Sequence, residues 1–382
     1  MTQTPTDMTP QELVQATEAG EPFQILDIRA PEHLASGRVD VVPADRFFNM
    51  AGSRLTAIDD PAALGLDPQR PLAVVCARGV SSRQLLGWLA ARGFPARSLL
   101  GGMAGWMLAL IERPLAPPAG FDVLLQFDRI GKGSLGYLLG SGGEALLIDP
   151  SRNARPLLDA AAARSLRIVG VADTHVHADY ISGGPGLARH LGVPYYLHPA
   201  DNVYPYDDTP GRLAIAPLQE GMEIPVGRAT LGVRHTPGHT EGSVSFLAGA
   251  DAAFDGDFIF IRSVGRPDLA GKAEAWTASL WASLERAKGE WGSARMVYPA
   301  HYANAGERRA DHAIGGALGT LAVDNEPFAI DDREAFTRWI LSRAGNFPEA
   351  YRTIKAVNVG LMQADADTAE ELEGGKNQCA AG

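Results

Sequence analysis

Residues 174–184 read Thr-His-Val-His-Ala-Asp-Tyr-Ile-Ser-Gly-Gly and bring two histidines and an aspartate together within five positions. The apolar run at 168–172 before them predicts a buried strand, and a helical pattern follows at 187–191. The polar side chains therefore lie on a loop that leaves a strand end, where α/β proteins commonly carry functional groups. Two imidazoles and a carboxylate are costly to crowd together unless a cation binds them. The stretch thus predicts a divalent metal site.

Three further motifs follow along the chain, and each comes after an apolar, strand-like run. They are His235-Thr-Pro-Gly-His239, Gly256-Asp257 and Tyr298-Pro-Ala-His301. With the His-x-His-x-Asp pattern they make four elements whose order resembles the metallo-β-lactamase superfamily. The resemblance implies an αββα sandwich, two sheets with helices outside, over residues 121–350. Strand-like runs at 123–126, 136–139 and 145–148 fit this architecture.

Length and composition limit the class of protein. The 382 residues suffice for two domains, and a chain with 46% hydrophobic and 21% charged residues is typical of a globular enzyme. The net charge of −11 argues against nucleic acid or an anionic membrane as a partner. Two cysteines allow no disulfide framework, and no signal peptide is visible, so we expect a cytoplasmic protein.

The first 113 residues carry a separate motif around Cys76. Apolar runs at 23–26 and 71–75 predict buried strands, and Cys76 stands at the end of the second. A tight loop and a helix from about 82 to 92 follow. A thiol in this place faces backbone N–H donors and the start of a helix, which favours the thiolate.

This region resembles a single rhodanese domain, an α/β fold with a parallel sheet and flanking helices. The matching segments are Asp27-Ile-Arg29, the Cys76 loop, Gly93-Phe94 and Leu100-Gly-Gly-Met-Ala-Gly-Trp106. The resemblance implies that Cys76 carries a sulfane sulfur as a persulfide. The family usually has arginines one and five residues after the cysteine, but here Ala77 and Ser81 stand there. Arg78 remains as a candidate for substrate binding, and the departure weakens the case for an anionic donor such as thiosulfate.

The segments between and after the two domains carry no catalytic motif. Residues 114–120 are Pro-rich and predict a semi-rigid linker. Residues 332–343 predict a helix, and residues 351–382 predict a C-terminal extension with an acidic, solvated stretch. Cys379 near its end is expected to be an exposed thiol without a role.

The motif residues also indicate how many metal ions the site holds and which type of superfamily reaction it favours. Hydrolytic members commonly hold two zinc ions and use a histidine where this chain has Tyr180. A neutral phenol is a poor zinc ligand, so the sequence favours one metal. The segment Gly265-Arg266-Pro267-Asp268, just after Asp257, resembles the persulfide dioxygenases.

By that resemblance His175, His239 and Asp257 would hold the metal, which matches the two-histidine, one-carboxylate set of non-haem Fe(II) oxygenases. Four neighbours would orient these ligands or act as ligands themselves: His177, Asp179, Tyr180 and His301. Arg266 would bind a carboxylate of the thiol carrier, or it would instead form a structural pair with Asp268 or another acidic residue.

The resemblance implies oxidation of a low-molecular-weight persulfide, such as glutathione persulfide, by O₂ to sulfite at one Fe(II) per chain. Sulfur transfer through Cys76 would be coupled to this oxidation. Its partners would be a thiol such as glutathione, and sulfite or thiosulfate. One alternative is a zinc-dependent thioester hydrolase resembling glyoxalase II, in which a metal-bound hydroxide attacks the substrate. Another is a non-catalytic persulfide sensor or sulfur carrier built on Cys76. The sequence leaves the oligomeric state open, a homodimer included.

Overall fold

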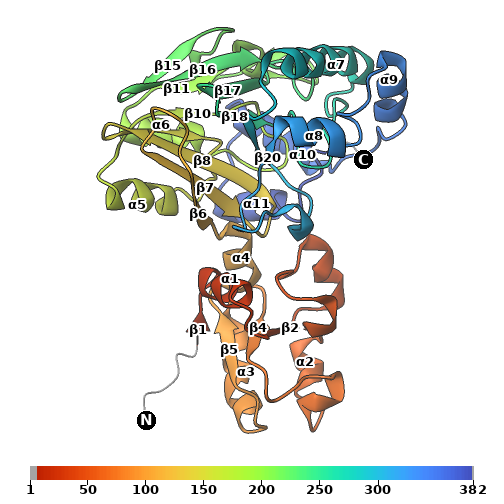
Figure 1. Cartoon of the computed structure of the whole chain (residues 1–382). Helices are drawn as coiled ribbons and strands as arrows, with labels where there is room; N and C mark the ends of the chain where they lie inside the picture. The colour runs from red at the N-terminus through yellow and green to blue at the C-terminus, as the bar shows by residue number, and fades with distance from the viewer. Residues whose placement is uncertain (1–6, 381–382) are drawn as a thin grey trace. The chain divides into compact units, whose positions relative to one another are not determined.

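The computed structural model describes residues 7–380, which form two compact units (Figure 1). Unit 1 comprises Met1–Ile111, Arg129–Lys132 and Gly374–Lys376. Unit 2 comprises Glu112–Asp128, Gly133–Glu373 and Asn377–Gly382. Unit 1 has one main sheet and unit 2 has two, and each unit has its own hydrophobic core.

Unit 1 is built on a five-stranded parallel sheet. Its strand order is β1 (Asp7–Met8), β5 (Ala96–Leu99), β4 (Leu72–Val75), β2 (Gln24–Asp27) and β3 (Phe47–Asn49). Its α-helices are α1 (Pro10–Glu18), α2 (Gly52–Leu55), α3 (Val80–Ala90) and α4 (Gly102–Leu108). Helix α1 begins with the expected capping box between Thr9 and Glu12.

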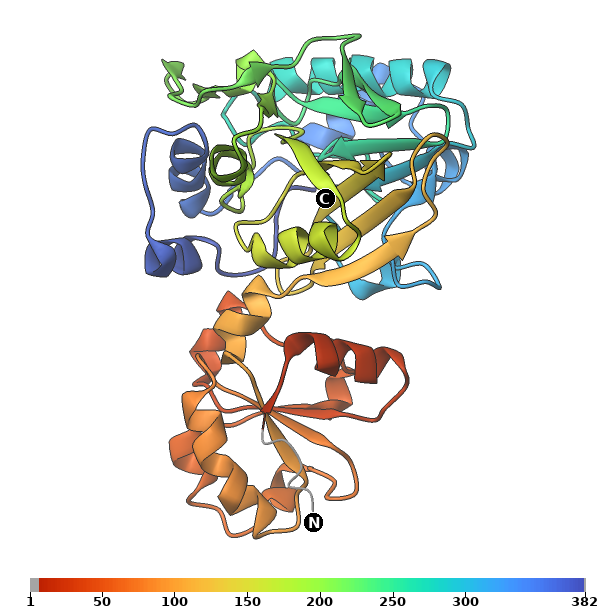
Figure 2. The ribbon, with the colours of Figure 1, turned by 90° about the vertical axis from the view of Figure 1, so that its left-hand side faces the viewer.

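Both faces of this sheet are covered, because its central strands are apolar on both sides. Ile25 and its neighbour Leu26 point to opposite faces and enter two different core clusters. Helix α1 supplies Leu13 to the first cluster, and α3 supplies Leu86 to the second. The two helices accordingly lie on opposite sides of the sheet (Figure 2). Unit 1 is therefore a parallel sheet with flanking helices, as the sequence predicts.

Unit 2 contains two sheets that face each other. The first has the order β14 (Ala216–Pro217), β11 (Tyr195–Leu197), β10 (Arg167–Ala172), β9 (Glu144–Ile148), β8 (Ser134–Ser141), β7 (Val123–Arg129) and β6 (Ile111–Leu115). The second has the order β15 (Glu223–Val226), β16 (Ala229–His235), β17 (Val244–Ala248), β18 (Ala252–Gly256), β19 (Met296–Pro299) and β20 (Gly316–Ala317). A short hairpin joins β12 (Val203–Tyr204) to β13 (Thr209–Pro210).

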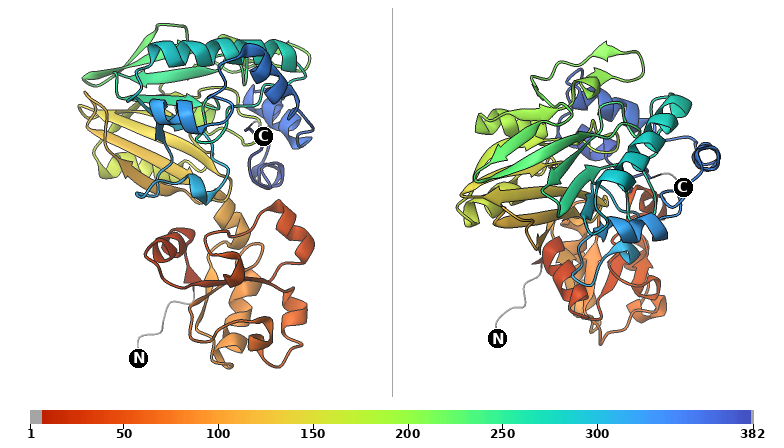
Figure 3. Two further views of the ribbon diagram at one scale, coloured as in Figure 1. Left: turned by 45° about the vertical axis from the view of Figure 1, so that its right-hand side comes forward. Right: turned by 45° about the horizontal axis from the view of Figure 1, so that its top comes forward.

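An apolar layer fills the space between the two sheets, with Leu139 and Ile148 from one and Phe246 and Phe254 from the other. Helices cover the outer faces (Figure 3). Helices α5 (Arg155–Ala163) and α6 (Gly184–Leu191) lie against β10. A second core cluster joins the other sheet to α7 (Ala273–Glu290), α8 (Leu318–Asp324) and α9 (Arg333–Leu341). This is the predicted αββα sandwich.

The boundaries within the chain differ from those expected. Part of the Pro-rich stretch is not a free linker, because Ile111–Leu115 is the edge strand β6 with alternating buried side chains. The C-terminal residues are not a separate extension either. Helices α10 (Ala350–Asn358) and α11 (Ala366–Leu372) belong to unit 2, where Tyr351 and Ile354 pack against Ala178. Within residues 7–380 no helix is long and apolar enough to cross a membrane.

Candidate metal centre

The candidate ligands lie on loops that follow four strands of unit 2. His175 follows β10, His239 follows β16, Asp257 follows β18 and His301 follows β19. The four strands come from both sheets, and the loops meet at one edge of the sandwich. A rigid scaffold thus holds side chains that are far apart in sequence.

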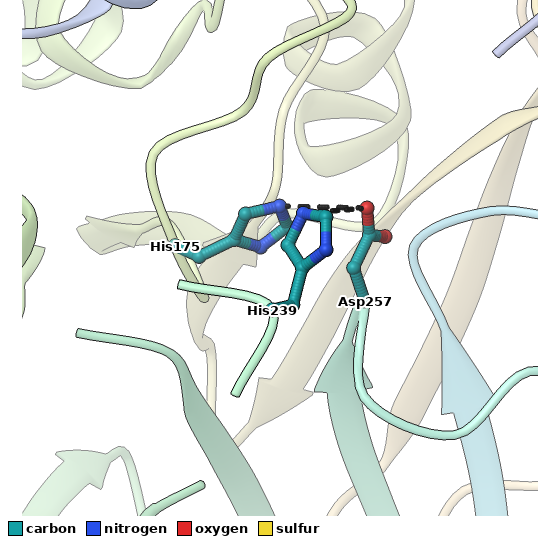
Figure 4. A group of neighbouring side chains, drawn as sticks. All are labelled: His175, His239 and Asp257. Carbon is teal, nitrogen blue, oxygen red and sulfur yellow. Dashed lines mark ion pairs between the residues drawn. The ribbon is translucent and has the colours of Figure 1, made fainter. Parts of the chain in front are cut away.

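His175, His239 and Asp257 converge on one point (Figure 4). The Nε2 atoms of His175 and His239 lie 3.6 Å and 3.4 Å from Asp257 Oδ2. All three side chains are buried, and these three atoms have no hydrogen-bond partner among the described residues. Buried polar atoms without a partner are rare because they cost free energy, unless they bind something else. Two imidazole nitrogens and a carboxylate oxygen form a metal-binding site typical of divalent transition metals.

The protonation of the triad also suits a metal. His239 directs Nδ1 to the carbonyl oxygen of Arg266 at 3.0 Å, which puts its proton there and leaves a lone pair on Nε2. Burial lowers the pKa of His239 to about 3, so this imidazole is neutral. Burial tends to raise the pKa of Asp257, but His301 and His175 hold it well below its usual range.

A chain of hydrogen bonds orients His175 in the same way. The Thr174 hydroxyl donates to Asp149 Oδ2 at 2.9 Å and lies 2.9 Å from His175 Nδ1. Its proton goes to Asp149, so it accepts from His175 Nδ1 and leaves Nε2 facing Asp257. The close approach requires Gly256, which has φ of 62°. A Cβ atom there would lie 2.3 Å from Thr174 Oγ1.

His301 and Asp179 lie beside the triad. His301 Nδ1 is 2.6 Å from Asp257 Oδ1, and His301 Nε2 is 3.2 Å from Asp179 Oδ2. Burial tends to lower the pKa of His301, but the two carboxylates raise it to about 10. His301 therefore binds one oxygen of Asp257, and the other oxygen faces His175 and His239.

His177 and Tyr180 form a separate pair. His177 Nε2 lies 3.2 Å from Asp149 Oδ1, and the Tyr180 hydroxyl lies 2.9 Å from the same nitrogen. The two rings stack with centroids 4.3 Å apart. His177 thus belongs with Asp149 and Asp173 rather than with the triad. Tyr180 is a buried, neutral phenol, because burial raises its pKa well above the usual value.

Arg266 has a clear partner. Its Nε and Nη2 each lie 2.6 Å from one oxygen of Asp268, and Nη2 also donates to the carbonyl oxygen of Gly345 at 3.0 Å. Of the two roles that the sequence left open, this bidentate pair is the one seen in the structure.

The sulfur of Cys76 in unit 1 takes part in several hydrogen bonds. The backbone N–H of Gly79 donates to its Sγ at 3.1 Å, and the Ser82 hydroxyl lies 3.2 Å away. Burial tends to raise the pKa of this thiol, but these bonds and the backbone of Arg78 lower it overall. The side chain of Arg78 is exposed. The expected thiolate-favouring environment is present.

Three residues near the metal centre were not recognised from the sequence. Cys379 was expected to be exposed, but it is fully buried. Its sulfur, an oxygen of Asp179 and a ring nitrogen of His301 all lie within 4.8 Å of one another. Lys355 in α10 is also fully buried. Burial lowers the pKa of Lys355 to about 8, although the negative charges of Asp201, Cys379 and Asp257 tend to raise it. The one available signal for Cys379 was that cysteine is among the most buried residue types.

Asp201 is a third such residue, and it ties two ligand-bearing loops together. One of its oxygens accepts hydrogen bonds from the backbone N–H of Val176 at 2.7 Å and from the Thr240 hydroxyl at 2.8 Å. Val176 is next to His175 and Thr240 is next to His239. One carboxylate therefore sets the spacing of two metal-facing histidines.

Two facing sheets with a His–His–Asp set at one edge define a metal-binding protein of the αββα class. The model of the metallo-β-lactamase superfamily matches residues 130–301. Persulfide dioxygenase ETHE1, mitochondrial, from Bos taurus is 33% identical over 211 residues, which cover 52% of this chain and 77% of that protein. The chain belongs to the metallo-β-lactamase superfamily.

Two further comparisons agree on the fold and differ in activity. A hydroxyacylglutathione hydrolase from Anaeromyxobacter dehalogenans is 32% identical over 179 residues, which cover 46% of this chain and 64% of that enzyme. The crystal structure of a metallo-β-lactamase from Staphylococcus aureus superposes with a TM-score of 0.53 at 30% identity, over 60% of this chain and 70% of that one. The relatives therefore share a family, and their names give different reactions.

Proposed function

We propose that unit 2 oxidises a low-molecular-weight persulfide, such as glutathione persulfide, with O₂ at one Fe(II) ion held by His175, His239 and Asp257. The observation that carries this proposal is the two-histidine, one-carboxylate set, whose three converging atoms have no other partner. Similarity to a persulfide dioxygenase supports it. When bound, Fe(II) in such a set supplies open positions for a sulfur ligand and for O₂, and the electron transfer between them.

The surrounding residues prepare this set. Thr174 and the carbonyl of Arg266 fix the two histidine tautomers, and His301 fixes the carboxylate of Asp257. Burial of the three ligands limits the access of water, which protects reactive sulfur species. The proposed reaction consumes one persulfide, one O₂ and one water, and yields one thiol and one sulfurous acid.

Cys76 is the proposed sulfur carrier of unit 1, in keeping with the rhodanese resemblance. Its thiolate would accept a sulfane sulfur from a persulfide or pass one to sulfite, forming thiosulfate. The hydrogen bonds from Gly79 and Ser82 support this, since they stabilise a charged sulfur. Arg78, exposed beside the loop, is the candidate for anion attraction. We propose a cytoplasmic location, with small thiols and sulfur anions as partners.

A zinc-dependent thioester hydrolase is the second candidate. The observation in its favour is the buried group of Asp179, His301 and Cys379, which could hold a second ion next to the first. Similarity to a hydroxyacylglutathione hydrolase also supports it. The ion pair between Asp179 and His301 speaks against it, because these groups already neutralise each other.

Metal analysis together with two assays distinguishes the candidates. Protein purified without oxygen should contain about one iron per chain, as expected for one triad. It should consume O₂ and form sulfite in equal amounts when glutathione persulfide is added. Two zinc ions per chain, hydrolysis of a glutathione thioester and no O₂ uptake would overturn the dioxygenase proposal.

A further inference from the structure

The segment Asn377–Ala380 is tied into unit 2 and carries a thiol to the edge of the metal centre. The backbone N–H of Gln378 donates to the Tyr351 hydroxyl at 2.9 Å, and Asn377 donates to the carbonyl oxygen of Tyr302 at 3.1 Å. The backbone N–H of Arg266 donates to the carbonyl oxygen of Cys379 at 2.9 Å. These bonds fix Cys379 beside Asp179 and His301.

Lys355 is a second and independent sign that a ligand belongs here. Its side chain is fully buried, and Nζ has no hydrogen-bond partner among residues 7–380. It interacts electrostatically with Asp201, Cys379 and Asp257, and it lines a cavity of about 20 Å³ together with Asp201, Val176 and Thr240. A buried ammonium without a hydrogen-bond partner is costly, so Lys355 is suited to face an anionic group at this position.

The segment contacts Arg266, which was expected from the sequence to bind the thiol carrier. Arg266, the residue expected to recognise the thiol carrier, instead meets Cys379 through its backbone and the carbonyl of Gln378 through Nη1 at 3.4 Å. An isolated two-residue bridge pairs Gly265 with Ala380. The cysteine of the chain itself therefore lies beside the centre, where the thiol of a small persulfide has to approach.

We propose that Cys379 is a sulfur-carrying residue of the metal pocket, which accepts a sulfane sulfur from a low-molecular-weight persulfide, and that Lys355 provides the positive charge facing the resulting persulfide anion. This inference rests on the proposed function, because it takes the same class of substrate. It assigns a modification site to Cys379 and an anion-binding role to Lys355.

The transfer is a thiol–persulfide exchange that needs no oxidant. The Cys379 thiolate attacks the terminal sulfur of R–S–SH, the S–S bond of the small persulfide breaks, and R–S⁻ leaves with that electron pair. A new S–S bond on Cys379 replaces the one that is lost. The Cys379 persulfide then releases its proton to the leaving thiolate and becomes an anion opposite Lys355.

The test uses the full-length Cys76→Ser variant, in which Cys379 is the one remaining cysteine. The iron-containing protein is mixed anaerobically with glutathione persulfide, alkylated and digested, and the C-terminal peptide is examined by mass spectrometry. We expect this peptide to gain the mass of one sulfur atom. Cys76→Ser/Cys379→Ala should gain none.

Lys355→Met in the same background tests the charge. Methionine has similar length and no charge, so the buried position should tolerate it. We expect sulfur loading of Cys379 to slow about tenfold, because the anionic sulfur loses the positive charge that faces it. An unchanged rate would overturn the role of Lys355. Glu349→Gln, at a charged residue just before the same helix, serves as the control.

Three outcomes decide the proposal. An unmodified Cys379 in folded protein that consumes persulfide and O₂ would overturn the sulfur-carrying role alone. A Cys379 that resists both sulfur loading and alkylation until the metal is removed would be a metal ligand, which also overturns it. Sulfur on Cys379 without any O₂ uptake by the wild-type protein would support this inference and overturn the dioxygenase reaction.

Discussion

His301 Nδ1 lies 2.6 Å from Asp257 Oδ1, while Asp257 Oδ2 faces the Nε2 atoms of His175 and His239. One carboxylate is thus divided between a protonated histidine and the proposed metal. Groups that orient metal ligands in this way commonly change affinity 10–100-fold when they are removed.

We therefore predict that His301→Gln weakens iron binding by about 10- to 100-fold without abolishing it, because the three ligands remain. Competition with a chromogenic chelator measures the affinity. His312→Gln, which changes a histidine outside the site, is the matched control. Wild-type affinity in His301→Gln would show that His301 does not support the metal.

His239→Ala should abolish both metal binding and O₂ uptake, since it removes one of three ligand atoms. Metal analysis and an oxygen electrode measure the two properties. His190→Ala, at an exposed position of α6, should change neither. Full iron content in His239→Ala would mean that the ligand set is a different one.

Cys76→Ser should remove sulfur transfer and leave oxidation of supplied glutathione persulfide largely intact, because a serine hydroxyl is not an adequate nucleophile in place of a thiolate. Thiosulfate formation and O₂ uptake are measured side by side. Loss of both activities would place Cys76 on the oxidation path and contradict the two-site scheme.

The reactivity of Cys76 should persist to lower pH than that of an ordinary cysteine. Its pKa is lowered, so the thiolate remains as pH falls below the usual range and is lost only near the lowered value. Ser82→Ala removes a hydrogen bond to Sγ and should move the pH profile of Cys76 alkylation upward. The wild-type and Ser82→Ala proteins both carry Cys379→Ala in this experiment, so that Cys76 is the one cysteine that can be alkylated. Ser81→Ala, at the exposed neighbouring serine, should leave the profile unchanged.

Tyr180→His tests why the site would hold one metal. The added imidazole could join Asp179 and His301 as a ligand for a second ion, above all zinc. We expect zinc content to rise and iron-dependent O₂ uptake to fall. Tyr180→Phe removes the hydrogen bond to His177 without adding a ligand, and should gain no zinc. A wild type with two metals, or a Tyr180→His variant that gains none, would contradict the hypothesis.

The sequence by itself determined the scaffold and most of the candidate site. Apolar periodicity is a local property, so the strands that precede His175, His239 and Asp257 could be predicted, and so could the position of Cys76 at a strand end. Each ligand lies on the loop after its strand, and the order of these motifs resembles the superfamily, which implied the fold. The resemblance to persulfide dioxygenases implied the triad.

Only the tertiary structure decided which distant groups meet. Cys379 follows an acidic stretch that predicts solvent exposure, yet the hydrogen bonds of its neighbours to Tyr351 and Tyr302 bury it beside His301. Nothing in the local pattern around Lys355 indicates a buried ammonium. Likewise, the choice of Asp268 as the partner of Arg266 is a matter of geometry. A local pattern specifies which face of an element is buried, but the partner on that face depends on long-range packing of the whole chain.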